Sequence, residues 1–434
     1  MDWFCGAGGS SQGLHAIPGV HVARAANHWE RAVETHASNF PTTDHYLGDI
    51  REAPVHRWPI CDLFWASPEC PQWSSARGKR RDYDNQPTLP GLEPERDEAA
   101  DRSRALMDEV PQYLSGVAAR GGRVLAGVVE NVVEVRAWSE WSRWLDDIRR
   151  LGYDTRLIAL NSMHAHAVAT PRAPQSRDRL YLAYWHRSLG RAPDWDKWLR
   201  PAANCDSHGR VDALQVFKRR GADMGRYRAS YVYRCPHRGC RPVEPEVIPA
   251  SAVIDPSLSA LRIGDRARPL AAATMRRICA GAERYWQTSR GAPSPLMVPL
   301  EGRDGKHARP ATLPHRTQTA RNETGIAQAP DLLVPYYGAS SASPATTPVG
   351  TLTTRDRYGL AQPAIEIEDV RFRMLSPAEI GRGMAFSGDY IVTGSKREQV
   401  RQYGNAVTPP VAELLGSALI EAITGDDLPR GDTP

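Results

Sequence analysis

Two stretches of the sequence carry residues that could react with a ligand. Cys70 lies in the proline-bounded stretch Ser67–Ser74, directly after the apolar run Asp62–Trp65. A thiolate is an effective nucleophile, and open α/β sheets place their active sites at the carboxyl ends of strands. Glu130 follows a second apolar run, where a buried carboxyl group can donate a proton or hydrogen-bond a heterocyclic ring. An inert buried cysteine, and a solvated carboxylate followed by a helix-capping Asn131, are the alternative interpretations.

Two further stretches could hold a ligand. Asp2-Trp-Phe-Cys-Gly-Ala-Gly-Gly9 predicts a glycine-rich turn, whose backbone can approach a ligand closely. Gln175, Arg177 and Arg179 lead into the apolar run Leu180–Trp185, and strand alternation puts these three side chains on one face. A plain strand-to-helix turn and a solvated basic run are the corresponding alternatives.

Short apolar runs alternate with helical patterns over residues 1–185, which predicts a parallel α/β sheet. The polar stretch Ser75–Arg104 is typical of a mobile surface loop. Residues 186–370 are irregular and rich in Pro, Arg, Thr and Ser, and a helical pattern returns over Ser376–Ile423. The expected strands are Cys61–Trp65, Arg123–Val129, Asp154–Leu160 and Leu180–Trp185, and the expected helix is Trp138–Leu151.

The composition narrows the class of protein. The chain has 434 residues, of which 41% are hydrophobic, so it can hold two or three domains and is not wholly disordered. Its longest aliphatic run, Val124–Val129, is too short to span a membrane, and no signal peptide follows Met1. Seven cysteines without a leader indicate a reducing compartment. We therefore expect a soluble, cytoplasmic protein.

Taken together and in this order, the four stretches resemble the DNA (cytosine-5) methyltransferase family. Gly48-Asp-Ile50 is similar to that family's adenine-contacting motif, and Gln402-Tyr-Gly-Asn-Ala-Val407 to its C-terminal motif. Arg373-Met-Leu-Ser-Pro-Ala-Glu379 resembles the segment before that last motif. The resemblance implies a Rossmann-like methyltransferase domain that depends on S-adenosylmethionine. Residues 1–185 and 371–434 would form it, interrupted by a large, irregular, partly β target-recognition insertion over 186–370.

The resemblance assigns four catalytic residues. Cys70 would be the nucleophile that adds to carbon 6 of a cytosine, and Glu130 would hold ring N3 and the exocyclic amine. Arg177 and Arg179 would contact the target nucleotide and stiffen the site. A cytosine inside a duplex must be flipped out to reach such a site, and the loop Ser75–Arg104 would close over it.

The resemblance also assigns a cofactor pocket. Trp29 would pack on the adenine of S-adenosylmethionine, and Asp49 would accept a hydrogen bond from its amine. The sequence departs from the family at two places: Glu69 and Pro71 flank Cys70, and the ribose hydroxyls could be held by His28 or by Glu30. The implied cofactor-binding residues are Phe4, Gly6, Gly8, Gly9, Trp29, Asp49 and Asn405.

The insertion contains a segment, 218–241, that is far more basic than the rest of the chain. Its only acidic residue is Asp223, whereas the whole chain has a net charge of just +5. Aromatic residues alternate with the basic ones over Phe217–Arg234, as in surfaces that follow a nucleic-acid backbone. The segment therefore predicts a phosphate-facing surface. Its basic residues are Lys218, Arg219, Arg220, Arg226, Arg228, Arg234, Arg238 and Arg241.

The same insertion carries two pairs of residues with the spacing of metal ligands. Cys205 and His208 are separated by two residues, and Cys235 and Cys240 by four, with His237 between them. Such pairs are typical of a small structural zinc ribbon, here over residues 205–240. Free thiols are the alternative. A site with four protein ligands would be structural, because it leaves no position open for catalysis.

The sequence is thus identified as a member of the DNA (cytosine-5) methyltransferase family. We expect it to act as a monomer on double-stranded DNA in a bacterial or phage setting, with or without a cognate restriction endonuclease. A tRNA cytosine-5 methyltransferase is one alternative. A catalytically lapsed sequence-specific DNA-binding protein is another, because Glu69 and Pro71 alter the surroundings of Cys70.

Overall fold

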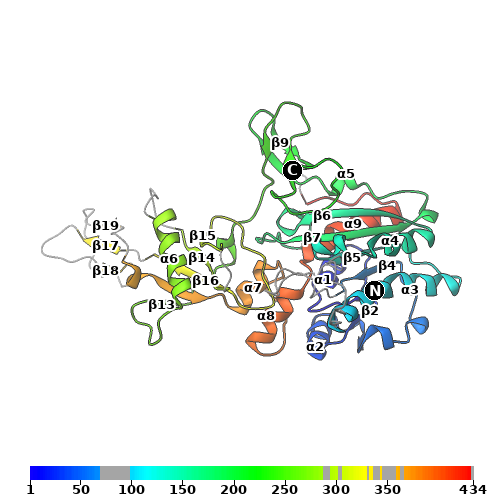
Figure 1. The fold of residues 1–434 in the computed structure, drawn as a ribbon, viewed down its shortest axis with the longest axis horizontal. Helices are drawn as coiled ribbons and strands as arrows, with labels where there is room; N and C mark the ends of the chain where they lie inside the picture. The colour runs from blue at the N-terminus through cyan, green and yellow to red at the C-terminus, as the bar shows by residue number, and fades with distance from the viewer. Residues whose placement is uncertain are drawn as a thin grey trace, which may run out of the picture. The chain divides into compact units, whose positions relative to one another are not determined.

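A computed structural model describes residues 1–68, 98–286, 294–301, 305–329, 332–335, 343–344, 358–361 and 366–431. The chain forms two compact units (Figure 1). The first comprises Met1–Ile248, Arg316–Arg321 and Gly381–Pro434, and the second Pro249–His315 and Asn322–Ile380. Residues 186–248 therefore belong with the elements of the first unit, and residues 371–380 belong to the second. Both assignments differ from the expected boundaries.

A seven-stranded sheet forms the centre of the first unit, in the order β3-β2-β1-β4-β5-β7-β6. Neighbouring strands are parallel from β3 to β5, whereas β7 is antiparallel to both β5 and β6. The expected all-parallel sheet is wrong at β7, because the link between β6 and β7 contains no crossover helix to reverse the chain. The strands are β1 Asp2–Trp3, β2 Arg24–Asn27, β3 Asp44–Leu47, β4 Leu63–Ala66, β5 Ala126–Asn131, β6 Tyr153–Asn161 and β7 Asp178–His186.

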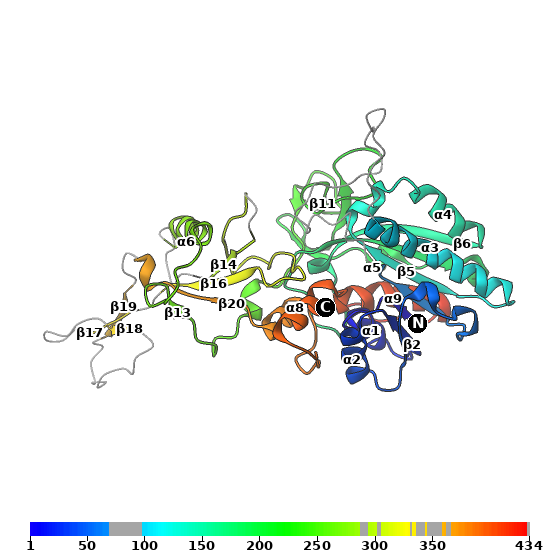
Figure 2. The ribbon, with the colours of Figure 1, turned by 60° about the horizontal axis from the view of Figure 1, so that its bottom comes forward.

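Helices cover both faces of this sheet (Figure 2). Phe64 and Val129 pack with Met107 and Trp144 on one face, whereas Trp65 on the next position of β4 packs with α9 on the other. This alternation is why both central strands read as continuous apolar runs. The helices of this unit are α1 Gly9–His15, α2 Glu30–Asn39, α3 Glu98–Ala119, α4 Trp141–Arg150, α5 Trp195–Trp198, α8 Lys396–Asn405 and α9 Pro409–Thr424.

Helix α9 lies in the core against α1. A Cβ atom at Gly13 of α1 would come within 2.2 Å of the Pro409 carbonyl oxygen, so only glycine permits this approach. In the part of the chain that the structure describes, the stretch Lys396–Thr424 passes a length and composition test for a membrane span. Its apolar window is 83% buried within the protein, as expected for a core helix.

Residues 202–243 of the first unit form a small β region. The β8–β9 hairpin lies beside a three-stranded antiparallel sheet, β10-β11-β12. Tyr231 and Tyr233 of β11 point into its core, while Arg234 is exposed. The strands are β8 Ala202–Cys205, β9 Gly209–Asp212, β10 Leu214–Phe217, β11 Tyr231–Arg234 and β12 Pro242–Val243.

The second unit is built on a five-stranded sheet in the order β13-β20-β16-β14-β15. Its core includes Ile278 of α6, Leu296 and Phe372. Glu379, from α7 Pro377–Gly383, is fully buried and its carboxylate receives two 2.7 Å hydrogen bonds from Arg373. The elements are α6 Ala272–Tyr285, β13 Leu261–Arg262, β14 Leu296–Pro299, β15 Arg309–Pro310, β16 Thr324–Gln328 and β20 Arg371–Met374, with a separate sheet of β17 Leu332–Pro335, β18 Ser343–Pro344 and β19 Tyr358–Ala361.

Candidate active site and cofactor edge

The sheet brings the predicted site residues to one edge of the first unit. Phe4, Trp29 and Asp49 follow the carboxyl ends of β1, β2 and β3, and Glu130 lies near the end of β5. The carboxyl ends of parallel strands meet at one edge, which is where open α/β sheets bind ligands. β4 ends at Ala66, and Cys70, Glu69 and Pro71, which follow it in the sequence, lie outside the described residues.

The centre of this edge is an ion pair between two predicted residues. Nε of Arg179 lies 3.0 Å from Oε1 of Glu130, and the side chains are only 17% and 11% exposed. The two residues come from the antiparallel neighbours β7 and β5, where Glu130 is opposite Tyr181. The pair fixes the orientation of the carboxylate.

Asn131, the residue after Glu130, connects this strand to the chain that leads to the predicted nucleophile. Its Nδ2 donates to the carbonyl oxygen of Pro68 at 3.3 Å, and its Oδ1 accepts from the backbone N–H of Val132 at 2.7 Å. Asn131 is therefore a bridge between the ends of β4 and β5. The sequence alone indicated only a capping residue.

Arg177 has a different environment from the one expected. Its side chain is buried, and it donates to the carbonyl oxygens of Gln318 (3.0 Å), Gly404 (3.1 Å) and Ala406 (3.1 Å). Burial, with a contribution from Arg179, lowers the pKa of Arg177 to about 9. Both terminal nitrogens of the guanidinium thus hold the backbone, and Nη2 contacts it on both sides of Asn405.

Gln175 completes this brace. Its Oε1 accepts from the N–H of Gln318 at 2.8 Å, and its Nε2 donates to the carbonyl oxygen of Gly383 at 3.0 Å. Gln175 and Arg177 therefore tie the short segment Arg316–Arg321 and the C-terminal part of the chain to the start of β7. Both side chains are buried within the protein.

The glycine-rich turn after β1 has the left-handed backbone that its composition predicts. Phe4 has φ 59°, Gly6 has φ 52° and Gly8 has φ 88°. Beside Gly6 a Cβ would meet no atom closer than the Phe4 oxygen at 3.9 Å, so space for a ligand adjoins the backbone there. At Gly9 the Cβ position is occupied by the Val407 carbonyl oxygen at 2.0 Å, so only glycine permits this close packing.

The remaining cofactor residues lie at or near the surface. Trp29 is half-buried at the N-terminus of α2, and the guanidinium carbon of Arg401 is 4.4 Å from its ring centroid. Asp49 accepts from Nε of Arg51 at 3.0 Å and begins a short 3-10 turn. His28, Glu30 and Asn405 are exposed. Both proposed ribose partners are therefore accessible.

A buried polar network beneath the turn was missed by sequence analysis. Ser10 and Ser11 each donate to Oδ2 of Asp2 at 2.6 Å, and Ser11 Oγ lies 2.8 Å from Nε2 of His36. Nδ1 of His36 is 2.8 Å from Nε2 of His45. Burial raises the pKa of Asp2 to about 6 and lowers that of His36 to about 3. No local motif joins these residues, which come from β1, α1, α2 and β3.

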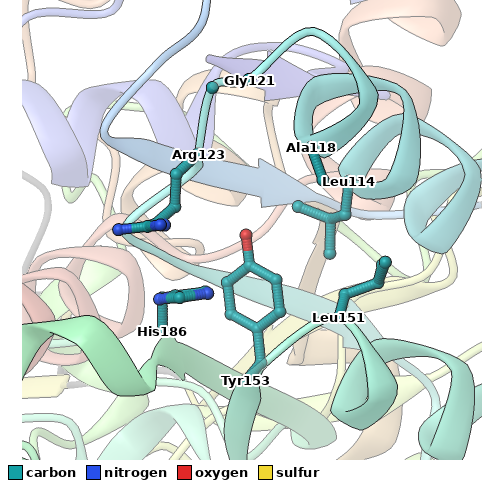
Figure 3. A pocket seen from close by; sticks show the side chains of 8 residues that line it. Leu114, Ala118, Gly121, Arg123, Leu151, Tyr153 and His186 are labelled. Atoms are coloured by element: carbon teal, nitrogen blue, oxygen red, sulfur yellow. The ribbon is translucent and has the colours of Figure 1, made fainter.

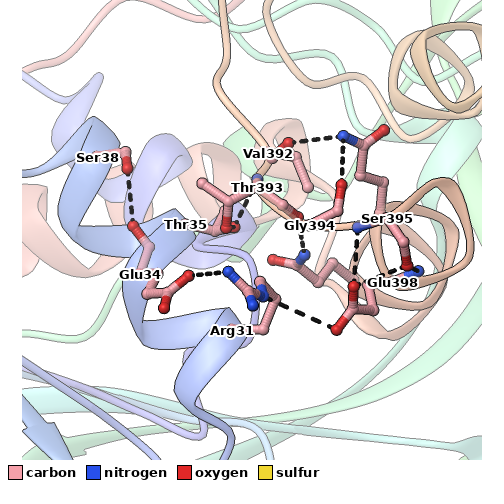
Figure 4. Close-up of polar contacts among 11 residues, drawn as sticks. Arg31, Glu34, Thr35, Ser38, Val392, Thr393, Gly394, Ser395 and Glu398 are labelled. Atoms are coloured by element: carbon pink, nitrogen blue, oxygen red, sulfur yellow. Dashed lines mark hydrogen bonds and ion pairs between the residues drawn. The ribbon is translucent and has the colours of Figure 1, made fainter.

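Contacts between α2 and residues 391–398 hold the C-terminal segment beside the cofactor edge (Figure 4). Thr35 accepts from the N–H of Thr393 at 3.0 Å, and Arg31 lies 3.8 Å from Glu398. Glu398 also caps α8 by accepting from Ser395. These contacts fix the start of α8, which carries Arg401 and Asn405.

A cavity of about 210 Å³ lies at the opposite edge of the sheet (Figure 3). Arg123, Tyr153 and His186 line it, near the start of β5, the start of β6 and the end of β7. Because these are not the ends that carry Glu130 and Trp29, the cavity is separate from the candidate active site.

The basic segment presents arginines to solvent and keeps its aromatic residues inside. Tyr231 and Tyr233 are buried, so the expected aromatic surface is wrong at these positions. Arg226 pairs with Glu134, and Arg228 pairs with Glu244 at 2.9 Å. Five arginines are exposed and make no ion pair with a described residue: Arg219, Arg220, Arg234, Arg238 and Arg241.

The structure brings the four predicted metal ligands together. The ligand atoms of Cys205, His208, Cys235 and Cys240 all lie within 4.8 Å of one another. His237 stacks on His208, with ring centroids 4.1 Å apart. Residue spacing alone did not show that the two pairs meet.

The expected loop Ser75–Arg104 ends earlier than its composition suggested. Residues 98–104 are the first turns of α3, and the rest of the loop lies outside the described residues. The first residues of α3 are rich in charged side chains, as surface loops are, so the loop was predicted to end at Arg104 although the helix begins at Glu98.

Comparison with known proteins supports the same interpretation. The model of the C-5 cytosine-specific DNA methylase family matches two segments of the chain, residues 1–90 and 304–421. Among curated proteins, the type II methyltransferase M.HgiBI of Herpetosiphon aurantiacus is 37% identical over 87 residues. This match covers 20% of the chain and 19% of the relative. M.HgiCII of the same organism is 28% identical over 200 residues, which is 45% of the chain and 38% of the relative.

Solved structures show the same fold. The structure of a Spodoptera frugiperda DNMT2 mutant has a TM-score of 0.52 and 14% identity, covering 97% of this chain and 99% of that one. The S. pombe Dnmt2 methyltransferase has a TM-score of 0.51 and 12% identity, with 98% of both chains covered. The expected α/β, Rossmann-like class is confirmed. The chain matches less than two fifths of the length of the curated relatives described above.

Proposed function

We propose that the protein transfers a methyl group from S-adenosylmethionine to carbon 5 of a cytosine in double-stranded DNA. The observation that carries the proposal is the Glu130–Arg179 pair, which lies beside the strand leading to Cys70 and is bridged to it by Asn131. A fixed carboxylate next to a cysteine-bearing loop is the arrangement needed to activate a pyrimidine ring for attack.

In the proposed reaction the thiolate of Cys70 adds to carbon 6, forming a sulfur–carbon bond and placing electron density on carbon 5. Because Arg179 takes Oε1 of Glu130, we expect Oε2 to face ring N3 and the exocyclic amine of the cytosine. Carbon 5 takes the methyl group, and a base then removes the carbon 5 proton. Elimination restores the double bond and frees the thiolate.

The cofactor edge fits S-adenosylmethionine, which supplies an electrophilic methyl group when bound. Three adjacent strands, β1, β2 and β3, are followed by Gly6, Trp29 and Asp49. Space is open beside Gly6, and the ring of Trp29 is partly exposed. In this arrangement Trp29 packs on the adenine, Asp49 accepts from its amine, and Phe4, Gly6 and Gly8 line the methionine side. His28 and Glu30 are both placed to reach the ribose hydroxyls.

Duplex DNA is the proposed substrate because five arginines of the insertion are exposed and make no ion pair with any described residue. Arginines hold phosphates in bidentate fashion, and base-flipping enzymes need contacts to the backbone that surrounds the flipped nucleotide. We propose that the protein works as a monomer in the cytoplasm of a bacterium or of a phage-infected cell. A cognate restriction endonuclease is a proposed genetic partner.

The test compares methyl transfer from radiolabelled S-adenosylmethionine to mixed-sequence duplex DNA and to tRNA. Labelling of the duplex, and 5-methylcytosine at one sequence in bisulfite reads from an expressing host, is the expected result. Exclusive labelling of tRNA would replace the DNA proposal with the tRNA alternative.

The covalent step needs a separate test. A duplex with 5-fluorocytosine at the modified position should form an adduct that survives denaturation, and Cys70→Ser should lose it while still binding DNA. Failure of the unchanged protein to form an adduct or to methylate either substrate would favour the catalytically lapsed alternative.

A further inference from the structure

We propose that Cys205, His208, Cys235 and Cys240 form a mononuclear structural zinc centre that joins two turns of the insertion. The first pair lies at the turn of the β8–β9 hairpin, and the second pair follows β11 and precedes β12. Each turn supplies two ligands. The inference concerns the fold of the insertion and is independent of the methyl-transfer proposal.

The distances match a tetrahedral ion. Nδ1 of His208 is 3.5 Å from the Cys205 sulfur, 3.6 Å from the Cys235 sulfur and 3.4 Å from the Cys240 sulfur. With zinc–sulfur bonds of about 2.3 Å and zinc–nitrogen bonds of about 2.0 Å, a tetrahedron has a sulfur–nitrogen edge of roughly 3.5 Å. The three observed separations therefore agree with one ion at the centre of the four atoms.

Hydrogen bonding alone does not explain this cluster. One imidazole nitrogen makes a single ordinary hydrogen bond, whereas Nδ1 of His208 is nearly equidistant from three sulfur atoms. Cys205 and Cys235 are also buried, so their sulfurs are gathered where bulk water does not separate them. Three thiolates and one imidazole are a common ligand set of structural zinc.

His237 is the nearest competitor of His208. Its Nδ1 lies 3.4 Å from the Cys235 sulfur, and its ring stacks on that of His208. The four proposed ligands all lie within 4.8 Å of one another without it. We assign His237 to packing against the ligand ring, which makes it a matched control for His208.

The centre has a structural consequence for the basic segment. Arg234, Arg238 and Arg241 are exposed and alternate along the chain with Cys235 and Cys240. The hydrophobic core of the small β region contains few residues. Binding of one ion by both turns would fix the backbone that carries these arginines. Zinc is therefore a folding element of the arginine-bearing turn.

The test measures zinc in the full-length protein, purified without a polyhistidine tag and without chelators. Mass spectrometry of the metal should give about one zinc per chain. Cys235→Ser and His208→Ala should each lose it, whereas His237→Ala should keep it. Replacement of zinc by cobalt should give the visible absorption of a tetrahedral thiolate site in the unchanged protein and in His237→Ala.

Two results would overturn the proposal: a folded chain without stoichiometric metal, or unchanged zinc content in Cys235→Ser. Loss of zinc in His237→Ala with retention in His208→Ala would overturn the ligand assignment. Because a variant could lose metal by unfolding, the far-ultraviolet circular dichroism and the S-adenosylhomocysteine affinity of each variant are recorded. If the circular dichroism and the affinity are unchanged, the loss of zinc is confined to the insertion. The metal content reports on the zinc site whether or not the protein methylates DNA.

Discussion

Nε of Arg179 lies 3.0 Å from Oε1 of Glu130 across the antiparallel β5–β7 pair. The guanidinium orients the carboxylate at the edge where the chain towards Cys70 leaves β4. A carboxylate held by a neighbouring strand is preorganised, so it needs no rearrangement when charge develops on a bound ring. The strand pairing itself thus sets the geometry of the proposed active site.

Glu130→Gln should abolish most methyl transfer while leaving DNA binding intact. The amide keeps the shape but cannot share a proton with ring N3 as the thiolate adds, so we expect a loss in kcat of about 100- to 1,000-fold. Glu134→Gln is the control, because Glu134 lies just after β5 and pairs with Arg226 instead of Arg179. Single-turnover assays with saturating duplex measure the effect. Equal losses in both variants would remove the specific role of Glu130.

Arg177→Met should destabilise the protein. It leaves the carbonyl oxygens of Gln318, Gly404 and Ala406 without their donor, and a buried unsatisfied group costs about 1–3 kcal/mol. Urea denaturation should show the loss, and Arg156→Met, at an exposed position of β6, should not. Normal stability with weakened DNA binding would instead favour the nucleotide contact expected from the family resemblance.

Arg401→Gln should weaken cofactor binding. Its guanidinium covers one face of Trp29, so only the other face can receive an adenine. An exposed cation–π contact is worth about 0.5–1 kcal/mol, which corresponds to a roughly two- to fivefold higher Kd for S-adenosylhomocysteine. Calorimetric titration measures it, and Arg397→Gln on the same helix should bind normally. An unchanged Kd in Arg401→Gln would mean that the stacked arginine does not position the ring.

The double variant Arg238→Ala/Arg241→Ala should bind duplex DNA more weakly and with a smaller salt dependence. Each phosphate that an arginine no longer neutralises lowers the slope of log K against log salt by about 0.9, so the pair should change it by nearly 2. Zinc content should be unaltered, because neither residue is a proposed ligand. An unchanged slope would place the phosphate-facing surface elsewhere.

Much of the site edge could be predicted from the sequence because short local patterns encode it. The apolar runs before Glu130 and Cys70 predicted strands over Arg123–Val129 and Cys61–Trp65, and β5 and β4 overlap them. The glycine-rich turn was also predictable, since left-handed backbone favours glycine. Alternation predicted a common face for Gln175, Arg177 and Arg179, but it could not show that the carbonyl oxygens of Gln318, Gly404 and Ala406 surround the Arg177 guanidinium.

The remaining features depend on distant segments. The antiparallel placement of β7 follows from its connection to β6, and the stacking of Arg401 on Trp29 joins α8 to α2. The metal ligands were recognisable as two pairs, but only folding shows that their donor atoms converge. Aromatic residues of the basic segment looked like a surface in sequence, yet Tyr231 and Tyr233 form the core of the small β region.

The buried network around His36 should make stability depend on pH. Burial and the nearby His45 lower the pKa of His36 to about 3, so the folded protein keeps it neutral while the unfolded chain protonates near 6.5. The contribution of His36 to the free energy of unfolding is therefore fully present above pH 6.5 and is lost as the pH falls towards 3. Between about pH 7.5 and pH 5 the native state should lose about 2 kcal/mol through this residue.

Asp2 contributes with the opposite sign, because burial raises its pKa to about 6 and its stabilising effect is lost as pH rises towards that value. His45, whose pKa burial also lowers, adds to the trend of His36. Urea titrations give the free energy of unfolding of the unchanged protein and of His36→Gln, and the difference between the two values reports on His36 alone. This difference should shrink by about 2 kcal/mol on going from about pH 7.5 to pH 5. His15→Gln, at an exposed position of α1, should show no such change. A pH-independent difference would mean that His36 is not kept neutral by the fold.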